Sequence, residues 1–154
     1  MKEVLKIGAI TIVKEAKKIH QNNIMLVKIG GFYRTYGRDA YILSNLFGYK
    51  TKQENKIITC GFPIKSIAKI ISKLENKKIN YMILDSRDNY NIEEKMDFKN
   101  LNTYDKQYQT SKIYVNNQRR IDNICDYLSK NSKKENLKYL LKEVEEIIYA
   151  KGKI

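Results

Sequence analysis

The 154-residue sequence contains one proline, one histidine, two cysteines and no tryptophan, and the few cysteines and the single histidine argue against a metal or disulfide site. Cys60 and Cys125 lie far apart and lack the spacing of zinc ligands, so we expect reduced thiols in a cytosolic protein. His20 has no identifiable cysteine or aspartate partner that would indicate a metal or catalytic site. No apolar run reaches about eighteen residues, and Met1 is followed by a mixed segment without a signal-peptide core. We therefore expect a cytoplasmic protein without a membrane partner.

Catalytic motifs are missing as well. The sequence has no G-x-x-x-x-G-K-[ST] loop that would cradle phosphates, and no recognisable pair of nucleophile and base. Asp85, near Arg87 and Asp88, is an acidic position without a second carboxylate of known geometry. The sequence thus predicts a protein that is not an enzyme, with no cofactor and no metal site.

Acidic residues are few: 17 against 30 basic residues, which gives a formal net charge of +13. The excess is uneven along the chain. Residues 1–85 carry 16 basic and 6 acidic residues, a net charge of +10, whereas residues 86–154 carry 14 and 11, a net charge of +3. A basic half joined to a more balanced half is typical of a polyanion-binding surface, and indicates nucleic acid as the partner.

Hydrophobic patterning predicts an α/β domain over residues 1–85, a small mixed sheet with flanking helices. Strands are expected over residues 24–29, 32–36, 49–52, 56–60 and 81–84. Helices are expected over residues 12–19, with Ile12, Ala16 and Ile19 on one face, and over residues 39–47 and 66–76. Gly48 is expected to stop the second helix, and Gly61-Phe62-Pro63 to turn the chain.

After Asp85 the character of the sequence changes. Residues 86–102 are polar and are predicted to form a linker, followed by a helical hairpin over residues 103–154. The first helix has an apolar seam of Ile113, Asn117, Ile121, Ile124 and Leu128. Residues 132–135 have the form of a capping box for the last helix. Two such helices cannot bury both apolar faces alone, so we expect them to dock on the α/β domain, pair with a second copy or bind a protein partner.

Aromatic and cationic side chains gather directly after a tight turn. Phe32 follows the backbone-permissive pair Gly30-Gly31, with tyrosines and arginines just beyond it. An aromatic ring next to guanidinium groups is suited to stack on a base or to wedge into a base step.

Five short motifs carry a family resemblance. In chain order they are Gly30-Gly31-Phe32-Tyr33, Tyr36-Gly37-Arg38-Asp39-Ala40, Tyr49-Lys50-Thr51-Lys52, Cys60-Gly61-Phe62-Pro63 and Tyr81-Met82-Ile83-Leu84-Asp85. With these motifs, the segment from Ile19 to Leu84, about half the chain, resembles the N-terminal, DNA-contacting domain of the MutS mismatch-repair family. The resemblance implies the fold of that domain. We expect no ATPase, clamp or connector domain of that family in this sequence, because it is too short and has no phosphate-cradling loop.

The resemblance also implies a role for one residue and a change at two others. It places Phe32 as the aromatic that stacks on a mispaired base from the minor groove. The family's glutamate two positions later, which bonds that base, is Arg34 here, and the family's aspartate is Gly31. A guanidinium at this position is suited to phosphates or to the electronegative floor of a narrow minor groove.

We therefore expect a non-catalytic module that binds distorted, mismatched or branched DNA through a basic face and an aromatic wedge. The predicted DNA-binding residues are Phe32, Tyr33, Arg34, Tyr36, Arg38, Lys50, Lys52, Lys65 and Lys69. One alternative is a protein-interaction adaptor that has lost DNA readout, with a homo-oligomer or protein interface in residues 103–154. A second alternative is an RNA-binding accessory factor, since aromatic and lysine side chains also suit single-stranded RNA.

Overall fold

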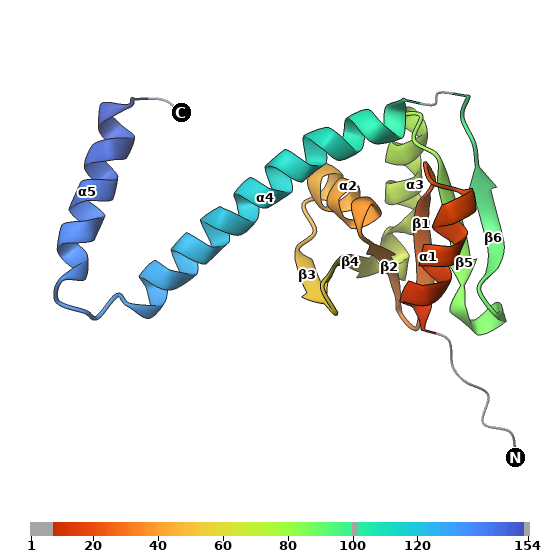
Figure 1. Cartoon of the computed structure of the whole chain (residues 1–154), viewed down its shortest axis with the longest axis horizontal. Coiled ribbons are helices and arrows are strands. Elements are labelled where there is room, and N and C mark those ends of the chain that lie inside the picture. The colour runs from red at the N-terminus through yellow and green to blue at the C-terminus, as the bar shows by residue number, and fades with distance from the viewer. Residues whose placement is uncertain (1–7, 100–101, 153–154) are drawn as a thin grey trace, which may run out of the picture. The chain divides into compact units, whose positions relative to one another are not determined.

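A computed structural model describes residues 8–99 and 102–152, and its strands form one six-stranded mixed sheet (Figure 1). The strands are β1 (Ile24–Ile29), β2 (Phe32–Tyr36), β3 (Thr51–Glu54), β4 (Ile57–Pro63), β5 (Tyr81–Asp85) and β6 (Asn91–Met96). Their order across the sheet is β3-β4-β2-β1-β5-β6, in which β1 and β5 are parallel and the other neighbours antiparallel. The predicted α/β fold is thereby confirmed.

Helices cover both faces of this sheet. They are α1 (Ala9–Ile19), α2 (Arg38–Phe47), α3 (Ile67–Asn76), α4 (Thr103–Lys130) and α5 (Leu137–Ala150), with short 3-10 turns η1 (Ile64–Ser66) and η2 (Ser86–Asp88). On one sheet face, Leu26 and Phe62 pack with Leu43 of α2 and Ile70 of α3. On the other face, α1 packs against β1 and β5 and lies in front of them in Figure 1. The core is thus divided between two layers, one on each side of the sheet.

The β1–β2 hairpin determines which aromatic side chains face water. Ile29 pairs with Phe32, so only two glycines form the turn, and Gly30 has a φ of +58°, which favours glycine. Successive residues of β2 then point to opposite faces of the sheet. Phe32 and Arg34 are exposed, whereas Tyr33 is buried in the core.

Two segments differ from the sequence-based expectation. Residues 86–102, expected as a linker, contain η2 and β6, which pairs with β5 at the sheet edge. The side chains of β6 are largely exposed, so its polar sequence carries no strand signal and pairing comes from the backbone. The predicted turn at Gly61-Phe62-Pro63 is wrong, because β4 continues through Pro63 and Phe62 is 1% exposed. Proline is tolerated here because the strand ends with it.

Three helix predictions also require correction. Ile19 is 79% exposed, and Val13 is the buried residue of α1. In α4, Ile113 is 62% exposed, whereas Tyr104, Ser111 and Val115 are buried. A helical period does not by itself select the face that packs, and here contacts with other elements select it. The predicted capping box is wrong as well, because α5 begins at Leu137 after Asn136 without a side-chain capping bond.

The chain divides into two compact units. The first unit, up to Val115, holds the sheet, α1 to α3 and the first part of α4. The second unit, from Asn116, holds the rest of α4 and α5. Among the residues that the structure describes, no helix is long and apolar enough to cross a membrane.

Candidate nucleic-acid interface

Part of one sheet face is left uncovered by helices. Helix α1 packs over β1, β5 and the parts of β2 and β4 at Tyr36 and Ile57, whereas β3 and the rest of β2 and β4 extend beyond it. A hollow of about 310 Å³ lies over these three strands. It is lined by Phe32, Arg34, Lys50, Lys52, Thr59, Cys60 and Gly61. We call these seven residues the open sheet face.

Phe32 supplies the exposed aromatic ring of this surface. It is the first residue of β2, and its backbone lies between Ile29 of β1 and Pro63 of β4. Strands on both sides hold that backbone in place, while the side chain is 53% exposed. Because the backbone is already fixed, the ring can stack on a nucleobase after only its side-chain torsions are ordered.

Arg34 lies on the same face, two residues along the strand. It pairs in register with Gly61, where an added Cβ would lie 3.3 Å from the Tyr33 carbonyl oxygen and 3.8 Å from Arg34 Cγ. The second distance is an ordinary contact, so the arginine is not crowded by its register partner. The guanidinium reaches Glu54 of β3, with Nη1 3.5 Å from Oε1. Both side chains are more than 40% exposed, and pairs of this kind contribute roughly 0–1 kcal/mol. A phosphate could therefore replace Glu54 as the partner of Arg34 at little cost.

Two lysines complete the charge on this surface. Lys50 comes just before the edge strand β3, and Lys52 lies in it; both are exposed. Lys52 pairs in register with Thr59 of β4. Three cationic side chains thus line the same hollow as one aromatic ring. This combination suits a ligand that carries both aromatic bases and phosphates, such as a nucleic acid.

The two predicted tyrosines are buried instead. Tyr33 is 5% exposed and stacks on Phe62 with ring centroids 5.4 Å apart. Tyr36 is 8% exposed and packs in the layer under α1. Burial raises the pKa of both phenols, which keeps them neutral. Buried rings cannot stack on a base, so these two residues support the surface from within.

The remaining predicted residues do not line the same hollow. Arg38 lies over the Tyr108 ring at 5.2 Å, with Nη1 3.8 Å from an Asp105 oxygen. Lys69 lines a separate hollow of about 470 Å³ formed by α2 and α3. Lys65 lies in η1, next to Ile64, whose N–H donates to the Gly31 carbonyl at 3.1 Å. The structure therefore brings together four of the nine predicted side chains: Phe32, Arg34, Lys50 and Lys52.

A second hollow on this face of the sheet, which the sequence did not reveal, adjoins the open sheet face. It has a volume of about 490 Å³ and is lined by Ile10, Val13, Lys14, Lys17, Lys18, Gln21, Tyr36, Gly37, Arg38, Ile57 and Tyr104. Tyr36 is the register partner of Thr59, so the two hollows meet on one face of the sheet. Lys14 and Lys18 of α1 thereby extend the cationic surface, because α1 packs on this face.

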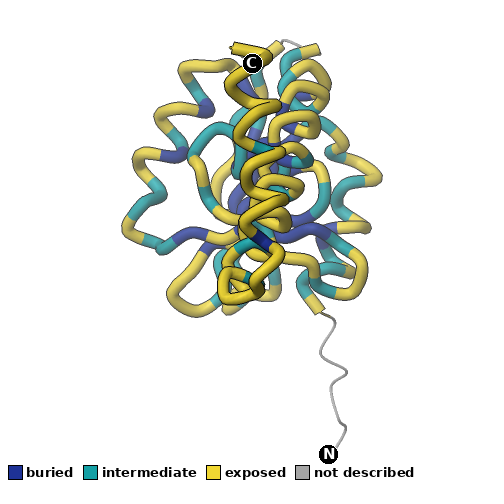
Figure 2. The backbone as a smooth tube through the Cα atoms, turned by 90° about the vertical axis from the view of Figure 1, so that its left-hand side faces the viewer, coloured by how far each residue is buried: buried dark blue, intermediate teal, exposed yellow. Residues whose placement is uncertain are grey.

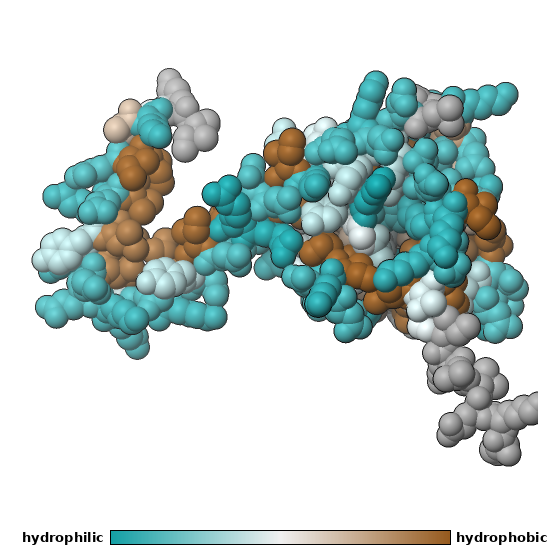
Figure 3. Space-filling view, viewed as in Figure 1, coloured by the Kyte–Doolittle hydropathy of each residue, from teal (hydrophilic) through white to brown (hydrophobic). Residues whose placement is uncertain are grey.

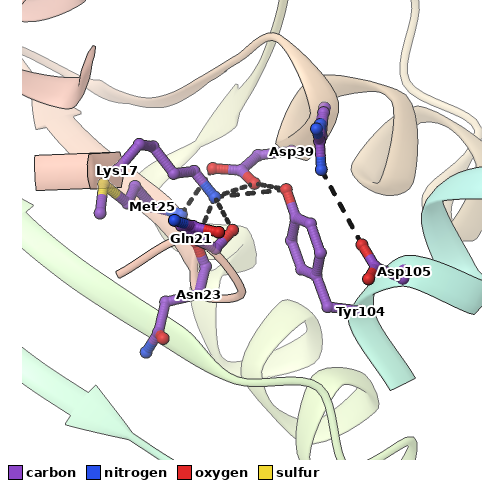
Figure 4. A network of polar contacts seen from close by, with 8 residues as sticks. Lys17, Gln21, Asn23, Met25, Asp39, Tyr104 and Asp105 are labelled. Atoms are coloured by element: carbon purple, nitrogen blue, oxygen red, sulfur yellow. Dashed lines mark hydrogen bonds and ion pairs between the residues drawn. The ribbon is translucent and has the colours of Figure 1, made fainter. Parts of the chain in front are cut away.

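A buried polar network holds α1 beside that surface (Figure 4). Asp39, 0% exposed, accepts hydrogen bonds from Lys17 Nζ at 2.6 Å, from the Met25 N–H at 2.9 Å and from the Tyr104 hydroxyl. Burial and the adjacent Asp39 raise the pKa of Tyr104, so it donates as a neutral phenol. The network joins α1, β1, α2 and α4. Lys17 lies 22 and Tyr104 lies 65 residues from Asp39, so no local sequence signal could reveal it.

Residues 8–122, which include both hollows, match the family model of MutS domain I. The chain belongs to the MutS domain I family. The DNA mismatch repair protein MutS of Fusobacterium nucleatum is 31% identical over 77 residues, which cover 47% of this chain and 9% of that protein. The chain thus spans only a small part of the length of this MutS relative.

The MutS domain I match is longer than the resemblance seen in the motifs. It begins in α1 and ends in α4, so it includes β6 and the first part of α4. Of these two elements, β6 pairs with β5 at the sheet edge, and α4 supplies Tyr104, which donates to Asp39. The match ends before α5.

Proposed function

We propose that this MutS domain I binds DNA at mismatched, branched or otherwise distorted sites, and that it does so in the cytoplasm without catalysing a reaction. The observation that carries the proposal is the placement of Phe32. Its ring is 53% exposed on a rigid strand and lines one hollow together with Arg34, Lys50 and Lys52. Stacking supplies recognition of an unpaired or poorly stacked base, and the cations neutralise the flanking phosphates.

Distorted DNA suits this surface better than a regular duplex. Inserting a side chain into a base step costs a few kcal/mol of unstacking. A mismatch or branch point has already lost part of that stacking, so the wedge gains more there. Affinity for any duplex comes mainly from phosphate contacts, and Phe32 adds the preference for a broken stack.

Arg34 gives this surface a different chemistry from the family motif. A carboxylate at that position would accept a hydrogen bond from a base, whereas the guanidinium only donates. Its nearest acid, Glu54, holds it across β4 at 3.5 Å. In the proposal, Arg34 exchanges this exposed carboxylate for a phosphate oxygen, so it contributes to affinity for all duplexes.

The test is a titration of Phe32→Ala and Arg34→Ala against matched, mismatched and branched duplexes of otherwise identical sequence. Phe32→Ala should weaken binding to the mismatched and branched duplexes by about 1–3 kcal/mol, and binding to the matched duplex by less. Arg34→Ala should weaken all three about equally, because a phosphate contact carries no pairing information. Tyr114→Ala is the matched control, since that ring is 60% exposed on α4, away from the open sheet face.

The titration also separates the alternatives. If Phe32→Ala leaves every affinity unchanged while the variant stays folded, the wedge is refuted and the adaptor hypothesis is favoured. If single-stranded RNA of the same sequence competes better than every duplex, the ligand is RNA. Saturable ATP turnover abolished by a point substitution in this chain would contradict the non-catalytic part of the proposal.

A further inference from the structure

Helix α5 carries an apolar stripe that faces water beyond its first residue, Leu137, which is buried. Apolar residues recur at spacings of three and four along it, namely Leu137, Leu140, Leu141, Val144, Ile147 and Ile148. Leu140 and Leu141 are 40% and 36% exposed, and Ile147 and Ile148 are 56% and 50% exposed. Figure 2 colours α5 as exposed along almost its whole length, and Figure 3 shows hydrophobic side chains gathered on its surface. A stripe of this regularity on a soluble helix is normally covered by another helix.

The charge of the second unit favours a protein, and not a nucleic acid, as the partner that covers the apolar stripe. Residues 116–152 carry 8 basic and 6 acidic residues, a net charge of +2, in contrast to the +10 of residues 1–85. A nearly balanced surface with an apolar stripe lacks the electrostatic character of a phosphate-binding surface.

Two charges beside the stripe specify the orientation of a partner helix. Lys138 and Glu145 are seven residues apart, so they lie two turns apart on the same flank of the stripe. Within the described part of the chain neither has an ion-pair partner, and the Lys138 ammonium lies over the Tyr139 ring at 5.1 Å. In an antiparallel two-fold pair the same flanks of both helices adjoin, and Lys138 of each copy meets Glu145 of the other. In a parallel pair these flanks lie on opposite sides of the interface.

We infer that two copies of the chain pair through this stripe, with their α5 helices antiparallel. A two-fold axis produces the Lys138–Glu145 contact two times in the dimer, once from each copy. An isologous interface requires this kind of self-complementarity.

A stable dimer interface needs more buried area than α5 alone can supply, so the rest of the second unit must take part. Helix α5 has 14 residues, about 21 Å of helix, which is short for a stable interface of about 800 Å² per partner. In the same unit Ile121 and Ile124 of α4 are 50% and 57% exposed. These side chains provide the further apolar area, so a bundle of four helices is the expected assembly.

The experiment is sedimentation velocity on the full chain over a range of concentrations around about 50 µM, because dimer stability depends on concentration. The wild type should be a dimer. Lys138→Glu and Glu145→Lys each place like charges at both contacts, and each should raise the dimer dissociation constant at least tenfold. The double variant K138E/E145K restores opposite charges and should return to within about threefold of the wild type. Equal mixing of the two single variants should form a heterodimer, because all-acidic flanks then meet all-basic flanks.

Glu146→Lys is the matched control, since it makes the same charge change one residue further along, on the side of α5 away from the stripe. It should leave the dissociation constant unchanged. Far-UV circular dichroism of each variant verifies that the helices persist. A monomeric wild type at every concentration would overturn the inference and leave the stripe to a different protein. A double variant as weak as the single variants, or a Glu146→Lys effect equal to that of Glu145→Lys, would overturn the antiparallel arrangement.

Discussion

Phe32 and Tyr33 are adjacent residues with opposite surroundings. Phe32 is 53% exposed and Tyr33 is 5% exposed, because neighbouring residues of a strand face opposite sides of the sheet. A shift of β2 by one residue would bury Phe32 and expose Tyr33. The register of β2 between β1 and β4 therefore decides which ring is exposed at the surface that we propose to bind DNA.

Asp39 is a buried charge of the first unit that Lys17 neutralises. Asp39→Asn should lower the free energy of unfolding by about 3 kcal/mol, because the Lys17 ammonium loses its counter-charge in a largely buried site. Asp105→Asn is the control: its carboxylate is 60% exposed and 3.8 Å from Arg38, so it should change stability by less than about 0.5 kcal/mol. Urea denaturation of both variants measures the difference. Equal stability of the two would show that the Asp39 network does not stabilise the fold.

Tyr104 should make the protein sensitive to alkaline pH. Its pKa in the folded protein is raised above the ordinary value of 10.0, first by burial and then by Asp39. The folded state therefore keeps a proton that the unfolded chain loses, and this stabilisation is complete below about pH 10 and is lost as the pH rises further. Tyr104→Phe should flatten the decline in unfolding free energy between about pH 9 and 11, by up to about 1.4 kcal/mol per pH unit.

The comparison uses slopes, because burial also raises the pKa of Tyr81 and contributes to the decline in every variant. Tyr127→Phe, at a ring that is 57% exposed, should leave the slope unchanged. Parallel curves for wild type and Tyr104→Phe would contradict the prediction.

At the scale of elements, the sequence predicts the strands and helices that bury apolar residues. Residues 24–29 form an apolar run because β1 is central and covered on both faces, and the prediction of this strand is confirmed. Strand β6 could not be predicted in this way, since its side chains face water. The packing face of α4 depends on the distant Asp39, so the apolar seam through Ile113 was a poor guide to it.

The candidate site was predictable to a similar extent. The order of Gly30-Gly31-Phe32 indicated an aromatic after a tight turn, and the structure places that ring at the surface. The gathering of Lys50 and Lys52 beside it depends on the pairing of β3 with β4, which the motifs do not encode. Lys14 and Lys18 of the second hollow reach the same face only through tertiary packing of α1.

These differences predict where the chain can be shortened. A chain ending at Val115 keeps β6 and the buried residues of the first part of α4, so it should unfold cooperatively with a midpoint temperature within a few degrees of the full chain. A chain ending at Asp85 lacks β6 and Tyr104, leaving the β5 edge unpaired and Asp39 without one of its donors. It should aggregate or lose its cooperative transition. Thermal melts followed by circular dichroism compare the two, and equal midpoints would show that β6 and α4 are dispensable.

At the scale of the whole molecule, the two units differ in the forces available to them. Residues 1–85 carry the large positive charge and the open sheet face, whereas the second unit has nearly balanced charge and the apolar stripe of α5. Salt screens contacts with phosphates strongly but affects the burial of apolar surface little. Ionic strength therefore offers a way to examine the two proposed activities of one chain separately.

We expect DNA affinity to fall roughly tenfold to a thousandfold between about 50 and 200 mM salt, as the neutralisation of about two to five phosphates requires. Arg34→Ala should make the slope of log affinity against log salt shallower by about 0.9, the contribution of one phosphate contact. Phe32→Ala should lower the affinity without changing that slope. Over the same range the dimer dissociation constant should change by less than about threefold, because apolar burial dominates that contact. Titrations of labelled duplex and sedimentation at both salt concentrations measure the two quantities on the same protein. A DNA affinity that stays flat over this range would show that the +13 net charge does not determine binding.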